Sequence, residues 1–180
     1  IFLTHLHSDH ISGVAEVLHN TWLYGRKHRA TVIGPVGTKE VISGFKKAYS
    51  QDLHERMRVL GRENLNIETV FEGAQDVSLN STEAAVVYDK DGLLISAFLV
   101  DHPDWPHAFG YRIEHRGKVI VISGDTRPST NLVQHAMGAD ILIHEALNTE
   151  IFNYISDLME VHGGPLKGGR AELISNVHTT

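Results

Sequence analysis

The sequence contains no cysteine, so disulfide bonds, thiol nucleophiles and cysteine–zinc sites are excluded together. It also has no long apolar run, because stretches such as residues 93–100 are far shorter than a membrane span. Basic residues are in deficit: 16 Lys and Arg stand against 22 Asp and Glu, for a formal net charge of −6. A broad basic surface for nucleic acid is therefore not expected.

The rest of the composition is that of an ordinary globular protein. Hydrophobic residues make up 42% and charged residues 21% of the sequence, which excludes disorder and fibrous repeats. The 180 residues suffice for one domain or a large part of one. One excess stands out, namely 13 histidines against 3 methionines and 2 tryptophans. Such an excess calls for an explanation in metal binding or proton transfer.

Hydrophobic periodicity predicts helices mixed with strands, and therefore an α/β layered architecture. The expected helices cover residues 11–20, 38–49, 131–137 and 149–161. The expected strands cover residues 1–4, 30–33, 67–71, 84–88, 93–100, 108–113, 118–123 and 140–144. Residues 51–65 are expected to be irregular, residues 163–169 to form a glycine-rich loop, and residues 170–175 a helical turn.

Candidate metal-ligating side chains are concentrated in the segment Thr-His-Leu-His-Ser-Asp-His, which ends at His10. Alternate side chains of an extended chain share a face, so His5, His7 and Asp9 are expected to point the same way. His10 lies where the chain turns into a helix and can reach the same centre. Imidazole and carboxylate are zinc ligands, and four of them exceed the needs of one ion with an open position. The pattern predicts a pair of metal ions; a histidine-rich surface loop is the alternative.

The opening segment IFLTHLHSDHISG resembles the His-x-His-x-Asp-His signature of the metallo-β-lactamase fold. The branch it resembles contains ribonuclease Z and zinc-dependent arylsulfatases. Further segments follow that branch in order at residues 33–38, 102, 108–113, 123–126 and 143–146. The resemblance implies a four-layer αββα sandwich, incomplete at both ends. Residues 1–180 would then be a partial domain that lacks N-terminal strands and the C-terminal strand with the last metal-ligating histidine.

The resemblance also implies a ligand set. It places His5, His7 and His102 on one ion, Asp9 and His10 on the second, and Asp125 between the two. Zinc is expected, with manganese or iron as alternatives, because nitrogen and carboxylate ligands admit all three. His107 competes with His102 for its place, and the position of His102 at the end of the apolar run favours His102. His107 is then expected to line the substrate pocket with Trp105 and Phe109, although a core position is the alternative for these aromatics.

Two further residues resemble a catalytic pair of ribonuclease Z. Glu145 resembles the glutamate of the "HEAT" motif, although this sequence reads His-Glu-Ala-Leu, and His178 resembles the histidine of the "HST" motif, which that glutamate orients. A carboxylate that holds an imidazole makes a suitable proton donor for a leaving group. Asp9, which would orient the attacking water, completes the candidate catalytic residues with this pair. The alternative is a buried acid and a histidine without a role. The remaining histidines are expected on the surface, at positions 19, 28, 54, 115, 135 and 162.

These features imply a hydrolase with two divalent ions that cleaves an ester-type bond. Only the link Glu114–Gly117 stands where bacterial ribonuclease Z carries an arm that grips tRNA. With the net charge of −6, this favours a small phosphodiester, aryl sulfate or carboxyl ester as the substrate. A tRNA 3′-processing endonuclease is the alternative, and a noncatalytic metal-binding scaffold is the second alternative. RNA is a less favoured partner and a membrane is not expected, while enzymes resembling this one are often homodimers. Because the N-terminal region is expected to be missing, cytoplasmic and exported locations both stay open.

Overall fold

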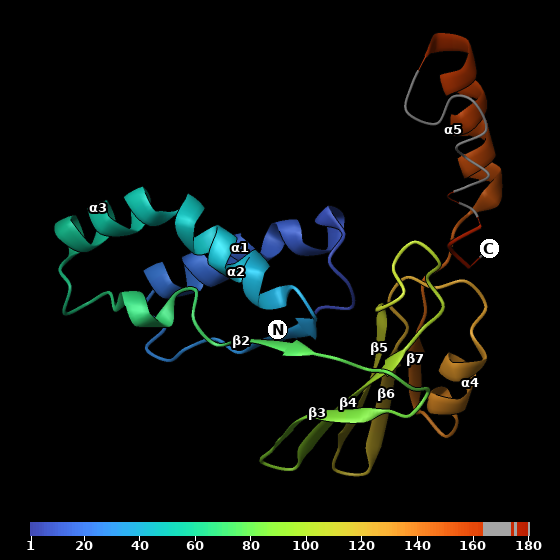
Figure 1. Cartoon of the computed structure of the whole chain (residues 1–180), viewed down its shortest axis with the longest axis horizontal. Coiled ribbons are helices and arrows are strands. Elements are labelled where there is room, and N and C mark those ends of the chain that lie inside the picture. The colour runs from blue at the N-terminus through green and yellow to red at the C-terminus, as the bar shows by residue number, and fades with distance from the viewer. Residues whose placement is uncertain (164–173, 175, 180) are drawn as a thin grey trace. The chain divides into compact units, whose positions relative to one another are not determined.

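The structure is a computed structural model that describes residues 1–163, 174 and 176–179. Contacts divide the chain into two compact units, Ile1–Ser78 and Leu79–Thr180, and Figure 1 labels the elements of both. Residues 164–169 of the predicted glycine-rich loop and residues 170–173 of the predicted helical turn lie outside the described residues. Among the helices of the described part, none is both long and apolar enough to cross a membrane.

The N-terminal unit combines helices with a two-stranded parallel sheet. Its elements are α1 (Ser8–Leu23), β1 (Val32–Pro35), α2 (Thr38–Ala48), α3 (Ser50–Leu60), the 3₁₀ helix η1 (Ile67–Thr69) and β2 (Ala74–Val77). Instead of the strand expected at residues 1–4, a single bridge joins Phe2 to Ile33 of β1. The core lies between the helices and the sheet, with Leu18, Trp22 and Leu53 almost completely buried.

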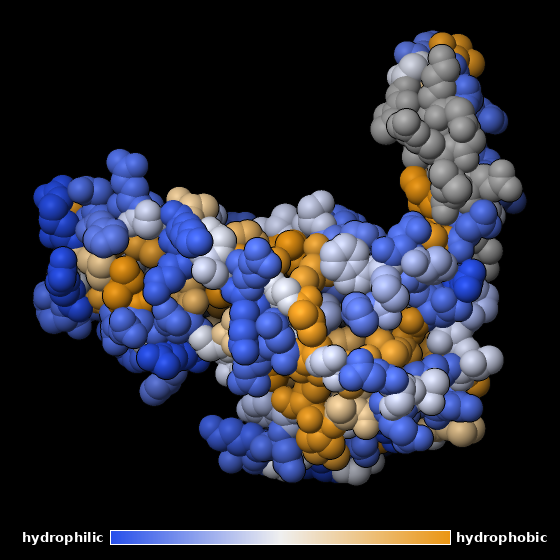
Figure 2. All heavy atoms as spheres, viewed as in Figure 1, coloured by the Kyte–Doolittle hydropathy of each residue, from blue (hydrophilic) through white to orange (hydrophobic). Residues whose placement is uncertain are grey.

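Besides residues 1–4, three segments of this unit differ from the prediction, and one of them is β2, where no strand was expected. The region 51–65 is helical as far as Leu60, and α3 buries Leu53 and Met57 one turn apart. The other residues of α3 are polar except Val59 and Leu60, which are exposed, and hydrophilic side chains cover much of the helix in Figure 2. The strand expected at 67–71 is instead η1, which begins where the Asn66 side chain accepts a hydrogen bond from the backbone N–H of Glu68.

The C-terminal unit contains a five-stranded sheet in the order β3-β4-β5-β6-β7. The strands are β3 (Ala85–Lys90), β4 (Leu93–Leu99), β5 (Phe109–His115), β6 (Lys118–Ile122) and β7 (Ile141–Ile143), and the helices are α4 (Thr130–Ala136) and α5 (Thr149–His162). Neighbouring strands are antiparallel from β3 to β6, and β7 runs parallel to β6. Phe98, Val121 and Leu132 form the centre of its core. This unit confirms the α/β architecture, whereas the four-layer arrangement stays a prediction.

Two tight turns connect the antiparallel strands. Asp91 and Gly92 link β3 to β4, and Arg116 and Gly117 link β5 to β6. All four residues have positive φ, at 54°, 76°, 49° and 72° in chain order. Such two-residue turns match the twist of the strands, but the left-handed backbone is unfavourable for a residue such as arginine. The short hairpin predicted between β5 and β6 is therefore confirmed.

Helix α5 differs from the other helices because none of its residues is buried. Its exposed apolar side chains include Ile151, Tyr154 and Val161, with exposed fractions of 59%, 65% and 77%. In Figure 1 the helix runs away from the strands of the sheet that precedes it. Packing therefore contributes little to its stability.

Candidate active site

Three histidines converge at the start of the first helix of the N-terminal unit. The chain first passes beside β1, where the Leu3 N–H donates to Ile33 O at 2.8 Å, and then turns so that His7 is the N-cap of α1. His5 Nε2 lies 3.0 Å from His7 Nδ1, and the ring centroids of His5 and His10 are 4.1 Å apart. His5 is completely buried. Imidazole nitrogens are thus gathered at one point, as a metal site requires.

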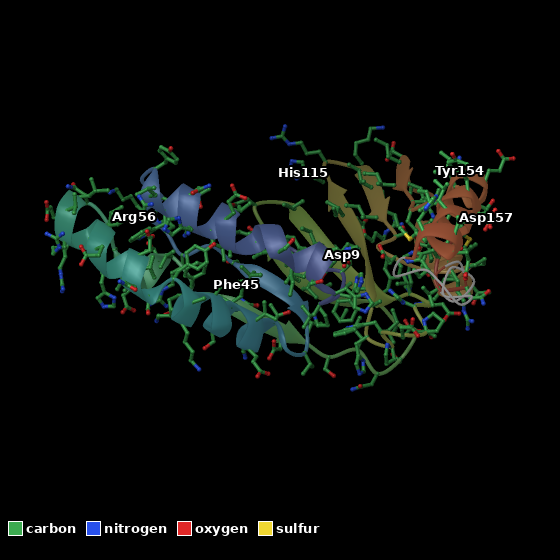
Figure 3. All side chains as sticks on the ribbon, turned by 90° about the horizontal axis from the view of Figure 1, so that it is seen from above. Asp9, Phe45, Arg56, His115, Tyr154 and Asp157 are labelled. Atoms are coloured by element: carbon green, nitrogen blue, oxygen red, sulfur yellow. The ribbon has the colours of Figure 1, made fainter. Side chains whose placement is uncertain are left out.

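Asp9 does not share a face with His5 and His7 as predicted. The helix begins at Ser8, so the alternation of an extended strand ends before Asp9, which lies in the first turn of α1 (Figure 3). Its side chain is 77% exposed, and Oδ2 is 3.4 Å from His10 Nε2. The prediction that Asp9 shares a face with His5 and His7 is therefore wrong. Its roles as a metal ligand and as the group that orients water stay predictions.

In the C-terminal unit, His102 follows the end of β4 and is 3% exposed. Its carbonyl oxygen accepts a hydrogen bond from the Trp105 N–H at 2.9 Å, and Trp105 O accepts one from the Ala108 N–H at 3.0 Å. These two bonds turn the chain back toward β5. His107 lies within the turn and is exposed. The choice of His102 over His107 as a metal ligand stays a prediction.

The expected pocket residues have unequal exposure. His107 is open to solvent, whereas Trp105 is half-buried and packs against the core of the C-terminal unit. Phe109 has no exposed surface and meets Tyr111 edge-to-face at a centroid distance of 6.3 Å. Burial raises the pKa of the neighbouring Tyr111 phenol. Phe109 is therefore a core aromatic, in line with the alternative, rather than an open pocket wall.

Asp125, Glu145 and His178 form a compact group in the C-terminal unit, although 53 residues separate the first from the last. Asp125 follows β6 and Glu145 follows β7, so both carboxylates lie at the same end of two parallel strands. His178 Nδ1 is 2.8 Å from Glu145 Oε2 and 3.7 Å from Asp125 Oδ2. The His178 ring centroid is also 5.9 Å from that of His102. An imidazole held by a carboxylate beside a second carboxylate can bind a metal or hold a proton.

Three hydroxyl residues support this group, and the sequence reasoning assigned no role to them. Ser123 is 1% exposed, and its Oγ accepts the Glu145 N–H at 3.0 Å. The backbone N–H of the buried Thr126 donates to Glu145 Oε1, and Thr179 Oγ1 donates to Thr126 O at 2.6 Å. Ser123 and Thr126 flank Asp125 in the motif Ser-Gly-Asp-Thr, so the motif itself was the signal that could have identified them.

Two of the six histidines expected on the surface are not there. His19 is 6% exposed, and its Nε2 lies 2.7 Å from Asp52 Oδ2. His135 is half-buried against the Phe98 ring at a centroid distance of 4.6 Å, with Nε2 3.0 Å from Thr82 O. In both cases the helix turns the ring toward a core rather than toward solvent. The surface prediction holds for the histidines at positions 28, 54, 115 and 162.

The donor groups in each unit fit a divalent cation. The N-terminal unit offers the imidazoles of His5, His7 and His10, and the C-terminal unit offers the imidazole of His102 and the carboxylate of Asp125. In the group of Asp125, Glu145 and His178, one candidate ligand atom from each residue lies within 4.8 Å of the others. Nitrogen and oxygen donors of this kind suit zinc, and manganese or iron equally.

Comparison with known proteins identifies the family of this chain. The family model described as "Beta-lactamase superfamily domain" matches residues 1–177. Ribonuclease Z of Mycobacterium bovis (strain BCG / Pasteur 1173P2) is 32% identical over 158 residues, which cover 86% of this chain and 54% of that protein. Ribonuclease Z of Mycobacterium marinum is 31% identical over 170 residues, which cover 90% and 58%. The chain thus spans little more than half the length of these relatives.

Solved structures share the fold. The short form of human tRNase Z matches with a TM-score of 0.60 and 21% identity, over 87% of this chain and 61% of that one. Zn(2+)-bound PqqB from Methylobacterium extorquens matches with a TM-score of 0.50 and 18% identity, over 94% and 48%. The ordered motifs, the donor groups and the family match lead to one conclusion: the chain belongs to the metallo-β-lactamase superfamily, with ribonuclease Z proteins among its relatives.

Proposed function

We propose that this chain is the metal-binding part of a hydrolase that cleaves phosphodiester bonds in RNA, as an endonuclease of the ribonuclease Z type. The observation that carries the proposal is the 2.8 Å contact of His178 Nδ1 with Glu145 Oε2 beside Asp125. The 31–32% identity to ribonuclease Z supports an RNA substrate over the small ester that the sequence alone favours. Those relatives give no support to an arylsulfatase.

The proposed metal ligands are those that the sequence motif implies. They are His5, His7 and His102 for one ion, Asp9 and His10 for the second, and Asp125 for both. Zinc is the proposed metal, because the donors suit it and a Zn(2+)-bound protein shares the fold. When bound, two divalent ions supply a water acidified toward neutral pH and stabilise charge on the phosphoryl oxygens.

The His178–Glu145 pair is the proposed proton donor. With Nδ1 held by the Glu145 carboxylate, Nε2 is the ring nitrogen that would deliver a proton to the leaving group. A departing ribose oxygen is strongly basic and needs a proton as it leaves. Ser123 and Thr126 fix the Glu145 side of the pair through its backbone N–H and its Oε1. The pair is thus oriented before substrate binds.

The leaving group provides the test of this assignment. We expect His178→Ala to lower kcat on a precursor tRNA by about 10²–10⁴-fold. Bis(p-nitrophenyl) phosphate should lose far less activity, because p-nitrophenolate departs without a proton. His54→Ala is the matched control, since His54 is exposed and lies on α3. Equal losses on the two substrates would mean that His178 serves as a ligand or a structural residue rather than as the donor.

Metal content decides between an enzyme and a scaffold. We expect mass spectrometry to find about two zinc ions per chain, as in dinuclear sites, with clear losses in His7→Ala and Asp125→Ala. Zinc-loaded protein that cleaves neither tRNA nor a synthetic ester would favour the noncatalytic scaffold. Absence of zinc from the wild type and no change in the variants would refute the metal centre altogether.

A small ester is the second candidate substrate, and the short β5–β6 hairpin supports it. Arg116 and Gly117 alone form the turn at the place where bacterial ribonuclease Z carries its tRNA-gripping arm. Without contacts remote from the reacting bond, an enzyme gains little from a large substrate. A kcat/KM for precursor tRNA below that for bis(p-nitrophenyl) phosphate would favour this candidate.

A further inference from the structure

Thr126 contacts all three segments that carry His102, Glu145 and His178 in the C-terminal unit. It has no exposed surface, although its neighbours Asp125 and Arg127 are both more open. A buried threonine must satisfy one hydroxyl and two backbone groups inside the protein, or pay the cost of burying them unpaired. In Thr126 each of these groups bonds to a different segment.

The hydroxyl bonds to the segment that carries His102. The Asp101 N–H donates to Thr126 Oγ1 at 3.1 Å, and the hydroxyl itself donates to Arg127 O at 2.7 Å. The Arg127 N–H in turn donates to Asp101 O at 2.9 Å. The residue directly before His102 is therefore fixed through both of its backbone polar groups.

The backbone of Thr126 bonds to the other two segments. Its N–H donates to Glu145 Oε1, while Glu145 Oε2 contacts His178 Nδ1. Its carbonyl oxygen accepts the hydroxyl of Thr179, the residue after His178, at 2.6 Å. His178 is thus connected to Thr126 along two routes, one through the Glu145 carboxylate and one through the following residue.

We propose that Thr126 is a positioning residue that fixes His102, Glu145 and His178 relative to one another. The inference rests on the proposed function and adds to it a residue that touches neither the substrate nor a metal. Residues that orient ligands are worth about 10–100-fold in metal affinity or activity. The hydroxyl bonds to Asp101 and to the adjacent Arg127 carbonyl, but to neither Glu145 nor Thr179. Its removal should therefore disturb His102 and leave the bonds to Glu145 and Thr179 in place.

Thr126→Val tests this inference, because valine keeps the shape and removes the hydroxyl. We expect the Asp101 amide to exchange its hydrogen faster, zinc affinity to fall by about 10–100-fold, and kcat to fall more than KM changes. Thr126→Ser, which retains the hydroxyl, should keep the amide exchange rate, the zinc affinity and kcat close to those of the wild type. Thr38→Val is the matched control: Thr38 is also fully buried and donates one hydrogen bond, to Pro35 O at 2.8 Å in the other unit. It should reduce thermal stability without moving the Asp101 amide or the zinc affinity.

The readouts separate the inference from the proposed function. If the wild type binds no zinc, the proposed function fails, and the Asp101 amide decides the inference by itself. Faster exchange in Thr126→Val with recovery in Thr126→Ser supports it. Unchanged exchange in Thr126→Val, or the same change in Thr38→Val, overturns it.

Discussion

His19 connects two helices of the N-terminal unit through a single carboxylate. Its ring packs beside Trp22 and Tyr49, at centroid distances of 5.8 Å and 5.3 Å, and its Nε2 meets Asp52 of α3. Arg56 Nε donates to both oxygens of Asp52, at 3.0 Å and 2.9 Å. The carboxylate therefore joins α1 to α3 while an arginine one turn along α3 stabilises its negative charge.

This arrangement makes stability depend on pH. Burial alone would raise the pKa of Asp52, but hydrogen bonds from Arg56 and His19, together with their charges, outweigh it and lower the pKa below 3.8. A carboxyl with a lower pKa in the folded state stabilises the fold above its ordinary pKa, and the effect is lost as the pH falls through the folded-state pKa. We expect Asp52→Asn to unfold at a lower temperature than wild type at neutral pH, with the difference shrinking in acid.

Thermal unfolding of metal-free protein from about pH 7 to about pH 3 measures this difference. Glu55→Gln is the control on the same helix, because its ion pair with Arg58 is largely exposed and should contribute little. A difference between Asp52→Asn and wild type that stays constant over the whole pH range would contradict the assignment.

For single residues, the sequence predicted candidate metal ligands better than it predicted hydrogen-bond partners. The chemistry of His5, His7 and His10 is visible in one short motif, whereas the bonds of Thr126 reach residues 25, 19 and 53 positions away. Local patterns contain no information about contacts of that range. For the same reason His19, whose partner lies 33 positions away, was expected on the surface.

Among the elements, short segments without a clear hydrophobic periodicity were the hardest to predict. Helix α3 buries only Leu53 and Met57 among many charges, so its apolar stripe is too narrow to stand out. The segment Ile67–Phe71 has the β-branched composition of a strand, yet the Asn66 cap and the burial of Val70 and Phe71 favour a 3₁₀ turn. Tertiary packing overrides intrinsic preference in such segments. The longer periodic elements, such as α2 and β4, were predicted within a residue or two.

The β5–β6 hairpin contains a residue that is poorly suited to its backbone conformation. Arg116 has a φ of 49°, in the left-handed region that glycine and asparagine adopt more readily. We expect Arg116→Asn to stabilise the protein by about 0.5–1 kcal/mol. Asp91→Asn in the β3–β4 turn, where φ is 54°, serves as the control. It should increase the free energy of unfolding by less, because aspartate already tolerates the left-handed region. Urea unfolding measures both, and an equal or larger gain at Asp91 would contradict the explanation.

For the whole molecule, charge is distributed unevenly between the two units. Ile1–Ser78 contains nine basic and nine acidic residues, so the formal net charge of −6 lies entirely in Leu79–Thr180. The acidic unit is the one that carries Asp125, Glu145 and His178. Bound metal ions would concentrate positive charge beside these residues, while the rest of the unit repels phosphate.

RNA binding should therefore depend only weakly on salt. Each phosphate neutralised by Lys or Arg adds to the slope of log K against log salt, and we expect a slope shallower than about −2 here. Fluorescence titrations of precursor tRNA at several salt concentrations, with zinc present throughout, measure it. A steep slope, near about −6, would reveal many phosphate contacts and contradict this expectation.

The superfamily was predictable from the sequence, but the substrate was not. Several motifs in fixed order, from His5 to Glu145, implied the superfamily, and the family match over residues 1–177 confirms it. Substrate choice depends instead on surfaces and attachments such as the β5–β6 turn, which vary freely on a shared scaffold. The sequence alone therefore favoured a small ester, whereas the relatives favour RNA.

The exposure of helix α5 affects local unfolding and proteolysis of the protein. A 14-residue helix without a buried side chain is close to the length at which helices are marginal in water. Its local opening should be frequent compared with that of the strands, whose hydrogen bonds break only when the sheet does. Among the described helices, α5 should accordingly be the one that a protease cuts most readily. The cut would separate His178 from the strands that carry its partners, so activity would be lost while most of the fold persisted.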